Sequence, residues 1–169
     1  MDNITANYLS RAEISVLIST LLYFFQNGAQ IFETIVIVPK WTAAPPESLQ
    51  MFKGKYALDF KVFWIVIHSI HEITFILAII FCWKLVFIRN WLLILFAIHF
   101  AVRVWTVAYF APNIIAFQKL ANDGKSAPSD LLKRTKQWRN LNYLRVGIFI
   151  AVSIALVPLL IQIINMKTN

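Results

Sequence analysis

Four long apolar stretches divide the chain, and each is long enough to cross a lipid bilayer. They lie at roughly 12–38, 60–84, 88–112 and 138–165, and a transmembrane helix needs about 20 mainly apolar residues. The first stretch is too long for a signal-peptide core and has no small-residue cleavage pattern, so we expect it to remain as a helix. The pattern predicts an all-α fold, an antiparallel four-helix transmembrane bundle, formed as one domain by residues 1–169.

Polar segments between the stretches predict two longer loops on one membrane face. The first loop covers 40–59 and the second covers 113–136, and both contain residues such as proline and glycine that interrupt helices. On the opposite face, the connection between Lys84 and Asn90 is short enough to be a tight turn.

Basic residues are unequally divided between these two faces. Ten flank the long loops: Lys40, Lys53, Lys55, Lys61, Lys119, Lys125, Lys133, Arg134, Lys136 and Arg139. Four lie on the other side: Arg11, Lys84, Arg89 and Lys167. The positive-inside rule therefore predicts a multi-pass integral membrane protein with the long loops in the cytoplasm and both termini on the opposite side.

Composition narrows the class of protein further. The chain is 59% hydrophobic and 14% charged, which excludes an ordinary soluble domain. Its net charge of +8 is spread beside the membrane spans, which favours lipid headgroups over nucleic acid as the partner of the basic residues. The single cysteine, Cys82, excludes an internal disulfide and a CxxC redox pair.

Each apolar stretch also carries one polar stripe, found by stepping about 100° per residue. The stripe of the first stretch contains Ser19, Tyr23, Gln26, Gln30 and Glu33. The stripe of the second contains Lys61, Trp64, His68, His71, Glu72 and Phe75. The stripe of the third contains His99, Arg103, Thr106, Phe110 and Asn113. The stripe of the fourth contains Trp138, Asn142 and Arg145. Ionisable groups are costly in hydrocarbon, so we expect these stripes to face the interior of the bundle.

A rise of about 1.5 Å per residue allows the depths of these groups to be compared. Glu33, His68, Arg103 and Arg145 come to similar depths below the long loops, and His71, Glu72 and His99 lie about a turn deeper. The sequence therefore predicts a polar pocket in this half of the bundle. A purely structural network of buried polar residues is the alternative to a functional site.

Three chemistries fit such a pocket. A transition metal, such as iron, zinc, manganese or copper, would be bound by imidazole and carboxylate groups, and its candidate ligands are His68, His71, Glu72 and His99. Acid–base catalysis would instead use Glu33 or Glu72 with a neighbouring histidine. An ion or proton path in a transporter is the third, and so small a bundle would need to form a homo-oligomer.

We therefore expect an integral membrane enzyme that oxidises or isomerises a lipophilic small molecule reaching the pocket from the bilayer. The expected catalytic residues are Glu33, His68, Glu72, Arg103 and Arg145. The expected substrate-binding residues are Gln26, Gln30, Trp64, Thr106, Trp138 and Asn142. A binding or transport protein that uses the same pocket, or a structural membrane subunit, is the alternative.

Two short segments carry a resemblance to a known family. Residues 27–33 (NGAQIFE), in a stretch that ends at Pro39, and residues 138–145 (WRNLNYLR) resemble the small four-helix membrane proteins of the anthrone-oxygenase-like group. The resemblance implies oxidation of a polycyclic aromatic compound, with Trp138, Asn142 and Arg145 at the matching positions. The pair His68 and Glu72 is also similar to the His-xxx-Glu pair of emopamil-binding-type sterol isomerases, which implies isomerisation instead.

Overall fold

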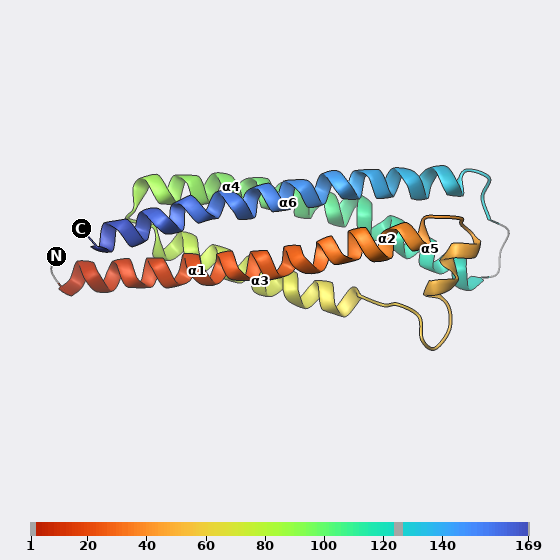
Figure 1. The fold of residues 1–169 in the computed structure, drawn as a ribbon, viewed down its shortest axis with the longest axis horizontal. Helices are drawn as coiled ribbons and strands as arrows, with labels where there is room; N and C mark the ends of the chain where they lie inside the picture. The colour runs from red at the N-terminus through yellow and green to blue at the C-terminus, as the bar shows by residue number, and fades with distance from the viewer. Residues whose placement is uncertain (1–2, 124–126, 169) are drawn as a thin grey trace.

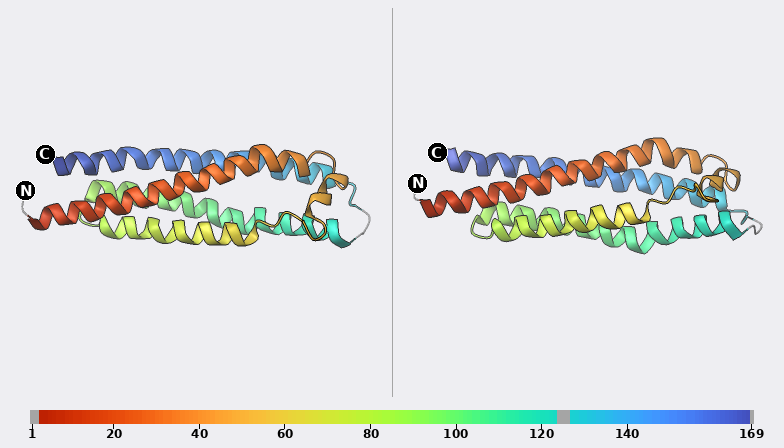
Figure 2. Two further views of the ribbon diagram at one scale, coloured as in Figure 1. Left: turned by 60° about the horizontal axis from the view of Figure 1, so that its bottom comes forward. Right: turned by 90° about the horizontal axis from the view of Figure 1, so that it is seen from below.

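Four long antiparallel helices pack side by side in the computed structural model, which describes residues 3–123 and 127–168 (Figure 1). The elements are α1 (Asn3–Phe32), η1 (Glu33–Ile37), α2 (Val38–Trp41), η2 (Glu47–Phe52), α3 (Lys61–Phe81), α4 (Val86–Trp105), η3 (Thr106–Phe110), α5 (Ala111–Asp123) and α6 (Leu131–Thr168). No strand occurs in this part of the chain, so the predicted all-α bundle is confirmed. The two termini lie at one end and the two longer connections at the other (Figure 2).

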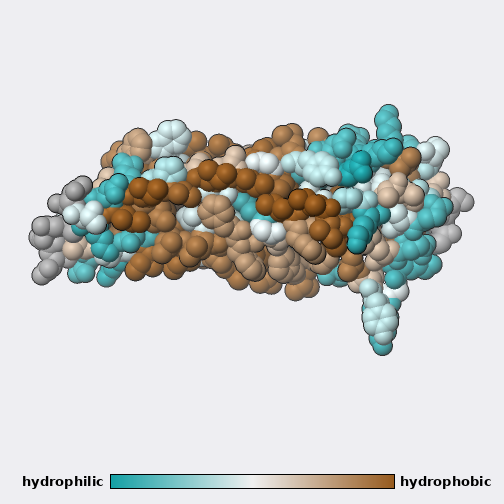
Figure 3. Space-filling model, viewed as in Figure 1, coloured by the Kyte–Doolittle hydropathy of each residue, from teal (hydrophilic) through white to brown (hydrophobic). Residues whose placement is uncertain are grey.

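All four helices are long and apolar enough to cross a membrane. The candidate spans are Ile4–Trp41, Lys61–Phe81, Val86–Asp123 and Leu131–Thr168. Their outward sides carry exposed hydrophobic residues such as Phe25, Ile65 and Ile154. These form an apolar band along the middle of the molecule, with hydrophilic residues towards its ends (Figure 3). The chain is therefore a multi-pass membrane protein embedded in the bilayer.

Three of the helices extend beyond the predicted bounds. The segment 113–136, expected to be a loop with a short surface helix after Pro128–Asp130, is helical as far as Asp123 and again from Leu131, where α6 itself begins. In the first loop, Glu47–Phe52 forms a 3-10 helix. The length of an apolar stretch indicates only the part of a helix that lies in the hydrocarbon layer. These helices continue past that layer into the more polar headgroup region.

Two prolines explain why the sequence pattern places helix ends too early. Pro39 lies two positions after the end of the π-helical turn η1, and Pro112 lies two positions after the end of η3. A proline lacks an N–H group and its ring crowds the carbonyl four residues earlier, and a π turn is one adjustment by which a membrane helix accommodates this. The Val38 N–H donates to the Glu33 carbonyl and the Ala111 N–H to that of Thr106, so both helices continue through the proline.

The buried residues form three zones along the bundle. An apolar cluster near the termini, the terminus-side core, comprises Ala12, Val16, Tyr23, Phe75, Ala78, Ile79, Cys82, Ile88, Leu92, Leu95, Val102, Phe149, Val152, Leu156, Leu159 and Ile163. A second cluster, the loop-side core, comprises Val38, Trp41, Leu49, Phe52, Phe110, Phe117, Ala121, Leu131 and Trp138. Between them lies a polar layer of the buried residues Gln26, Asn27, Gln30, Thr34, His68, His71, His99 and Asn142, together with the half-buried Glu72, Arg103 and Arg145.

Candidate functional site

A chain of hydrogen bonds joins three helices at the centre of the polar layer. The Tyr23 hydroxyl of α1 lies 2.9 Å from Nδ1 of His99 on α4. On the other side of the same ring, Nε2 of His99 lies 3.1 Å from Oε2 of Glu72 on α3. Both nitrogens of His99 are therefore engaged by residues that are far apart in the sequence.

One protonation pattern satisfies every group in this Tyr23–His99–Glu72 chain. With Glu72 ionised and His99 neutral, the Nε2–H group donates to the carboxylate and the Tyr23 O–H group donates to the lone pair of Nδ1. The Arg103 side chain adds a positive charge, because its Nε lies 4.0 Å from the same carboxylate oxygen. A cationic side chain therefore lies beside the outer end of the chain.

The inner end of the chain is enclosed by aromatic rings. The Tyr23 side chain is fully buried, and its ring centroid lies 4.2 Å from that of His71 and 6.2 Å from that of Phe149. His71 is also fully buried, and neither of its ring nitrogens has a hydrogen-bond partner among the described residues. The inner end of the chain, at Tyr23 and His99, is therefore shielded from lipid and from bulk water.

The outer end of the chain opens into a pocket of about 500 Å³ between α3 and α4. The pocket is lined by His68, Ser69, Glu72, Phe100, Arg103, Val104, Val107 and Ala108. Its apolar walls include Phe100 and Val107, which are 53% and 66% exposed on the side of the bundle. The pocket therefore faces the bilayer sideways, with Glu72 and Arg103 in its wall.

His68 is the third titratable group in this wall, beside Glu72 and Arg103. Its side chain is only 7% exposed, and its Nδ1 atom has no hydrogen-bond partner in the described part of the chain. The ring packs against the Trp64 ring at a centroid distance of 5.4 Å. His68 and Glu72 are four residues apart on α3, which is why one face of the helix presents both of them to the pocket.

A separate polar network surrounds Arg145 on α6. The Arg145 guanidinium donates through Nη2 to Oδ1 of Asn142 at 2.6 Å and through Nη1 to the Thr106 hydroxyl at 3.5 Å. The Asn142 amide donates to the Thr34 hydroxyl at 2.9 Å. The Arg145 guanidinium also lies over the Phe110 ring, 4.4 Å from its centroid. This network links α6 to both π-helical turns.

The predicted site residues therefore divide into several groups. His68, Glu72 and Arg103 line the pocket, and His99 lies behind it. Thr106, Asn142 and Arg145 belong to the second network. The remaining predicted residues lie elsewhere. Gln26 and Gln30 are buried in α1, and each has a side-chain atom without a hydrogen-bond partner among the described residues. Glu33 lies near Trp64 and Arg145, and Trp138 donates to the Phe110 carbonyl in the loop-side core.

The described residues give the metal hypothesis no support. They contain no group of three histidine, cysteine, aspartate or glutamate side chains arranged to hold a metal ion. Of the four predicted ligands, His99 already uses both ring nitrogens in hydrogen bonds to Tyr23 and Glu72.

Tyr23 has a role that the sequence did not predict. Its place in the polar stripe of the first helix made it a possible aromatic residue of the pocket lining, whereas in the structure it is a hydrogen-bond partner of His99 and does not line the pocket. Its position could have indicated this role, because Tyr23 lies about one turn before Gln26 in the polar stripe that faces the histidines of the other helices.

Comparison with known proteins gives no match: no family model, no curated protein and no solved structure corresponds to this chain. The anthrone-oxygenase-like resemblance therefore stands on its short motifs alone. The four long apolar helices agree with the coarser assignment, a small multi-pass membrane protein.

Proposed function

We propose that this protein is a membrane-embedded acid–base isomerase that takes a lipophilic small molecule sideways from the bilayer. The observation that carries the proposal is the lateral pocket, whose wall presents Glu72 at the outer end of the Tyr23–His99–Glu72 chain. Ligand sites are typically concave and mainly apolar, with a few well-placed polar groups.

The surroundings of the polar layer favour sideways entry over passage through the bundle. The terminus-side core and the loop-side core lie on either side of this layer along the bundle axis. A solute that crossed from one face of the membrane to the other would have to pass both apolar clusters. A lipophilic ligand in the bilayer meets the pocket directly.

The chemistry we propose is a proton shift catalysed by one carboxylate. Glu72 takes a proton from one carbon of the substrate and delivers a proton to another, so that one C–H bond breaks, another forms and no oxidant is consumed. The Glu72 side chain is 25% exposed, and between the two transfers its proton exchanges with solvent, so D₂O supplies deuterium to the product. Arg103 stabilises the ionised Glu72 before the transfer and is placed to donate a hydrogen bond to an oxygen of the substrate. His68 is the second donor in the wall.

Isomerisation agrees better with this site than oxidation does. The residues that carry the anthrone-oxygenase-like resemblance, Trp138, Asn142 and Arg145, do not line the pocket. His68 and Glu72, which carry the resemblance to the sterol isomerases, both line it. The proposed substrate is therefore a lipophile with a hydrogen-bonding oxygen and an exchangeable C–H group.

Deuterium uptake tests this proposal without requiring that the substrate be identified first. Purified protein would be incubated in D₂O with the lipophilic extract of its host membranes, and the extract would then be analysed by mass spectrometry. We expect wild-type protein to introduce deuterium into one lipophile as its double bond moves. Glu72→Gln should lower the rate by about 100-fold or more, because general acid–base groups contribute about 10²- to 10⁴-fold.

Glu13→Gln is the matched control, because Glu13 pairs with Lys167 near the termini, far from the pocket. It should retain the wild-type rate. Equal rates in Glu72→Gln and wild type, both with folded protein, would contradict the proposed role of Glu72. Specific ligand binding without deuterium uptake would indicate a binding protein instead.

A further inference from the structure

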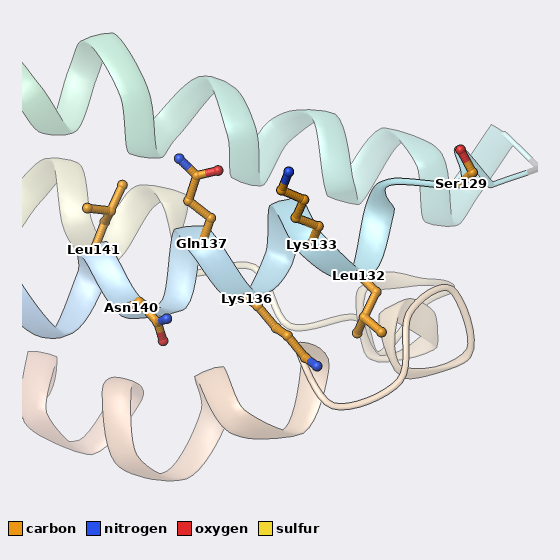
Figure 4. A pocket seen from close by; sticks show the side chains of 7 residues that line it. All are labelled: Ser129, Leu132, Lys133, Lys136, Gln137, Asn140 and Leu141. Carbon is orange, nitrogen blue, oxygen red and sulfur yellow. The ribbon is translucent and has the colours of Figure 1, made fainter.

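A second hollow lies on the outward face of α6, at the end of the bundle that carries the long loops. It has a volume of about 690 Å³ and is lined by Ser129, Leu132, Lys133, Lys136, Gln137, Asn140 and Leu141. Figure 4 shows Lys133 and Gln137 on one side of the α6 axis and Lys136 and Asn140 on the other. None of these residues belongs to the lateral pocket or to the Arg145 network.

The lining of this hollow suits a phosphate group. Lys133, Lys136, Gln137 and Asn140 recur at spacings of three and four residues, so they form two pairs that flank the middle of the outward face of α6. All four carry hydrogen-bond donors and two are cations, whereas no carboxylate lines the hollow. Lysine is a common phosphate ligand, and amide side chains complement it by donating hydrogen bonds to oxygen.

The depth of the hollow can be estimated from α3. This helix has 21 residues, which at about 1.5 Å each matches the hydrocarbon thickness of a bilayer of about 30 Å. Lys61 therefore marks the hydrocarbon edge on the loop side. Because His99 pairs with Glu72 in the antiparallel α4, Phe110 lies at the level of Lys61, and Trp138 bonds to the Phe110 carbonyl.

The hollow therefore straddles the hydrocarbon edge. On α6, Leu141 lies on the membrane side of Trp138, whereas Lys136 and Lys133 lie two and five residues beyond it. These steps correspond to about 3 Å and about 8 Å along the helix axis. Lysines at this depth lie among the lipid headgroups, and Leu141 lies beside the first carbons of the acyl chains.

We propose that this hollow binds the phosphate-bearing headgroup of an anionic phospholipid. Lys133 and Lys136 bind the phosphate, Gln137 and Asn140 donate to the glycerol and ester oxygens, and Leu141 contacts an acyl chain. The site is independent of the proposed isomerase activity, since it shares no residue with the lateral pocket. It would fix the depth and rotation of α6 in the membrane.

Native mass spectrometry of the full chain in detergent tests the site, with dioleoyl phosphatidylglycerol as the probe. The test variant is the double substitution Lys133→Gln and Lys136→Gln. The control is Lys53→Gln with Lys55→Gln, which removes the same charge from exposed residues of the first loop. We expect the test variant to bind the lipid about tenfold or more weakly, since each lysine near a headgroup contributes about 1 kcal/mol, and the control to bind as wild type does.

Two further arms identify the ligand. Dioleoylglycerol, which has the same chains and no phosphate, should bind at least tenfold more weakly than phosphatidylglycerol, and millimolar inorganic phosphate should not displace the lipid. Equal losses in both lysine pairs, or equal binding of dioleoylglycerol, would overturn the proposal. Displacement by inorganic phosphate alone would also overturn it, in favour of a site for free phosphate.

All substituted lysines are exposed. The double charge reversal Lys133→Glu with Lys136→Glu is a second variant, and it should abolish lipid binding.

Discussion

His99 connects the lateral pocket to the buried core, because its two ring nitrogens bond to Glu72 and Tyr23. Tyr23 does not line the pocket, so any influence it has on chemistry passes through His99. We regard it as a positioning residue that fixes the orientation and protonation pattern of the imidazole, as a carboxylate or carbonyl does behind many functional histidines.

The substitution Tyr23→Phe tests this role. It keeps the ring that packs against His71 and Phe149 and removes only the hydroxyl. We expect the pH profile of deuterium uptake to shift and the rate to fall, with a loss of stability of only about 1 kcal/mol, because a single hydrogen bond between membrane helices contributes little. Tyr143→Phe, at an exposed position of α6, should leave both quantities unchanged. An unchanged pH profile in Tyr23→Phe would assign the hydroxyl a packing role alone.

Residue types and spacing predicted the site only in part. The stripes placed Glu72, His99 and Arg103 in one polar pocket and left open which carboxylate pairs with which arginine, since an ionisable group in hydrocarbon needs a partner. In the structure Glu72 lies 3.1 Å from His99 and 4.0 Å from Arg103. They did not separate Glu72, which reaches the pocket, from Glu33, which does not line it. That difference depends on the rotation of each helix about its axis, and side-chain packing between helices sets this rotation.

At the scale of elements, the two π-helical turns are joined by one pair of residues on α6. Asn142 donates to Thr34 in η1 and Arg145 donates to Thr106 in η3. Residues Val107 and Ala108 of η3 also line the lateral pocket. The Asn142–Arg145 pair therefore supports the helical turn that forms one wall of the pocket.

Asn142→Leu should weaken this support. The substitution removes the bond to Thr34 and the carbonyl that accepts from Arg145 at 2.6 Å. We expect a loss of about 2–4 kcal/mol, because hydrogen bonds to charged groups contribute about 1.5–3 kcal/mol, measured by thermal unfolding in detergent. Asn165→Leu, at an exposed position of the same helix outside both networks and both pockets, should change stability by no more than about 0.5 kcal/mol. Equal stability of both variants would show that the network contributes nothing to the fold.

The elements also show where sequence reasoning was reliable. The existence and direction of four helices followed from the apolar stretches, because burying backbone polar groups in lipid leaves few alternatives to a helix. The predicted end of the third helix was too early, because proline commonly terminates a helix, whereas this one continues past Pro112 to Asp123. The first helix likewise continues past Pro39, but only as far as Trp41. A π turn before each proline lets the helix continue, and nothing in the local residue pattern distinguishes that outcome from a true end.

At the scale of the whole molecule, the asymmetry of the bundle suggests which side faces the cytoplasm. The helices other than α3 extend past the level of Lys61 and carry the loop-side core with them. The basic residues of the long loops lie at this end. Ten lysines and arginines flank the long loops and four lie at the other end. This imbalance predicts that the end with the long loops faces the cytoplasm, since positively charged loops are retained there.

Cysteine labelling in intact cells tests this orientation, and Cys82 makes the experiment simple. Burial raises the pKa of the Cys82 thiol to about 12, so this cysteine has almost no reactive thiolate near neutral pH and the wild-type chain serves as an unlabelled background. A membrane-impermeant maleimide should label Lys84→Cys, in the short turn, in intact cells. It should label Lys55→Cys, in the first loop, only after the membrane is permeabilised. The reverse pattern would place the long loops outside, and the charge imbalance would then reflect headgroup binding by residues such as Lys133 and Lys136 instead of orientation.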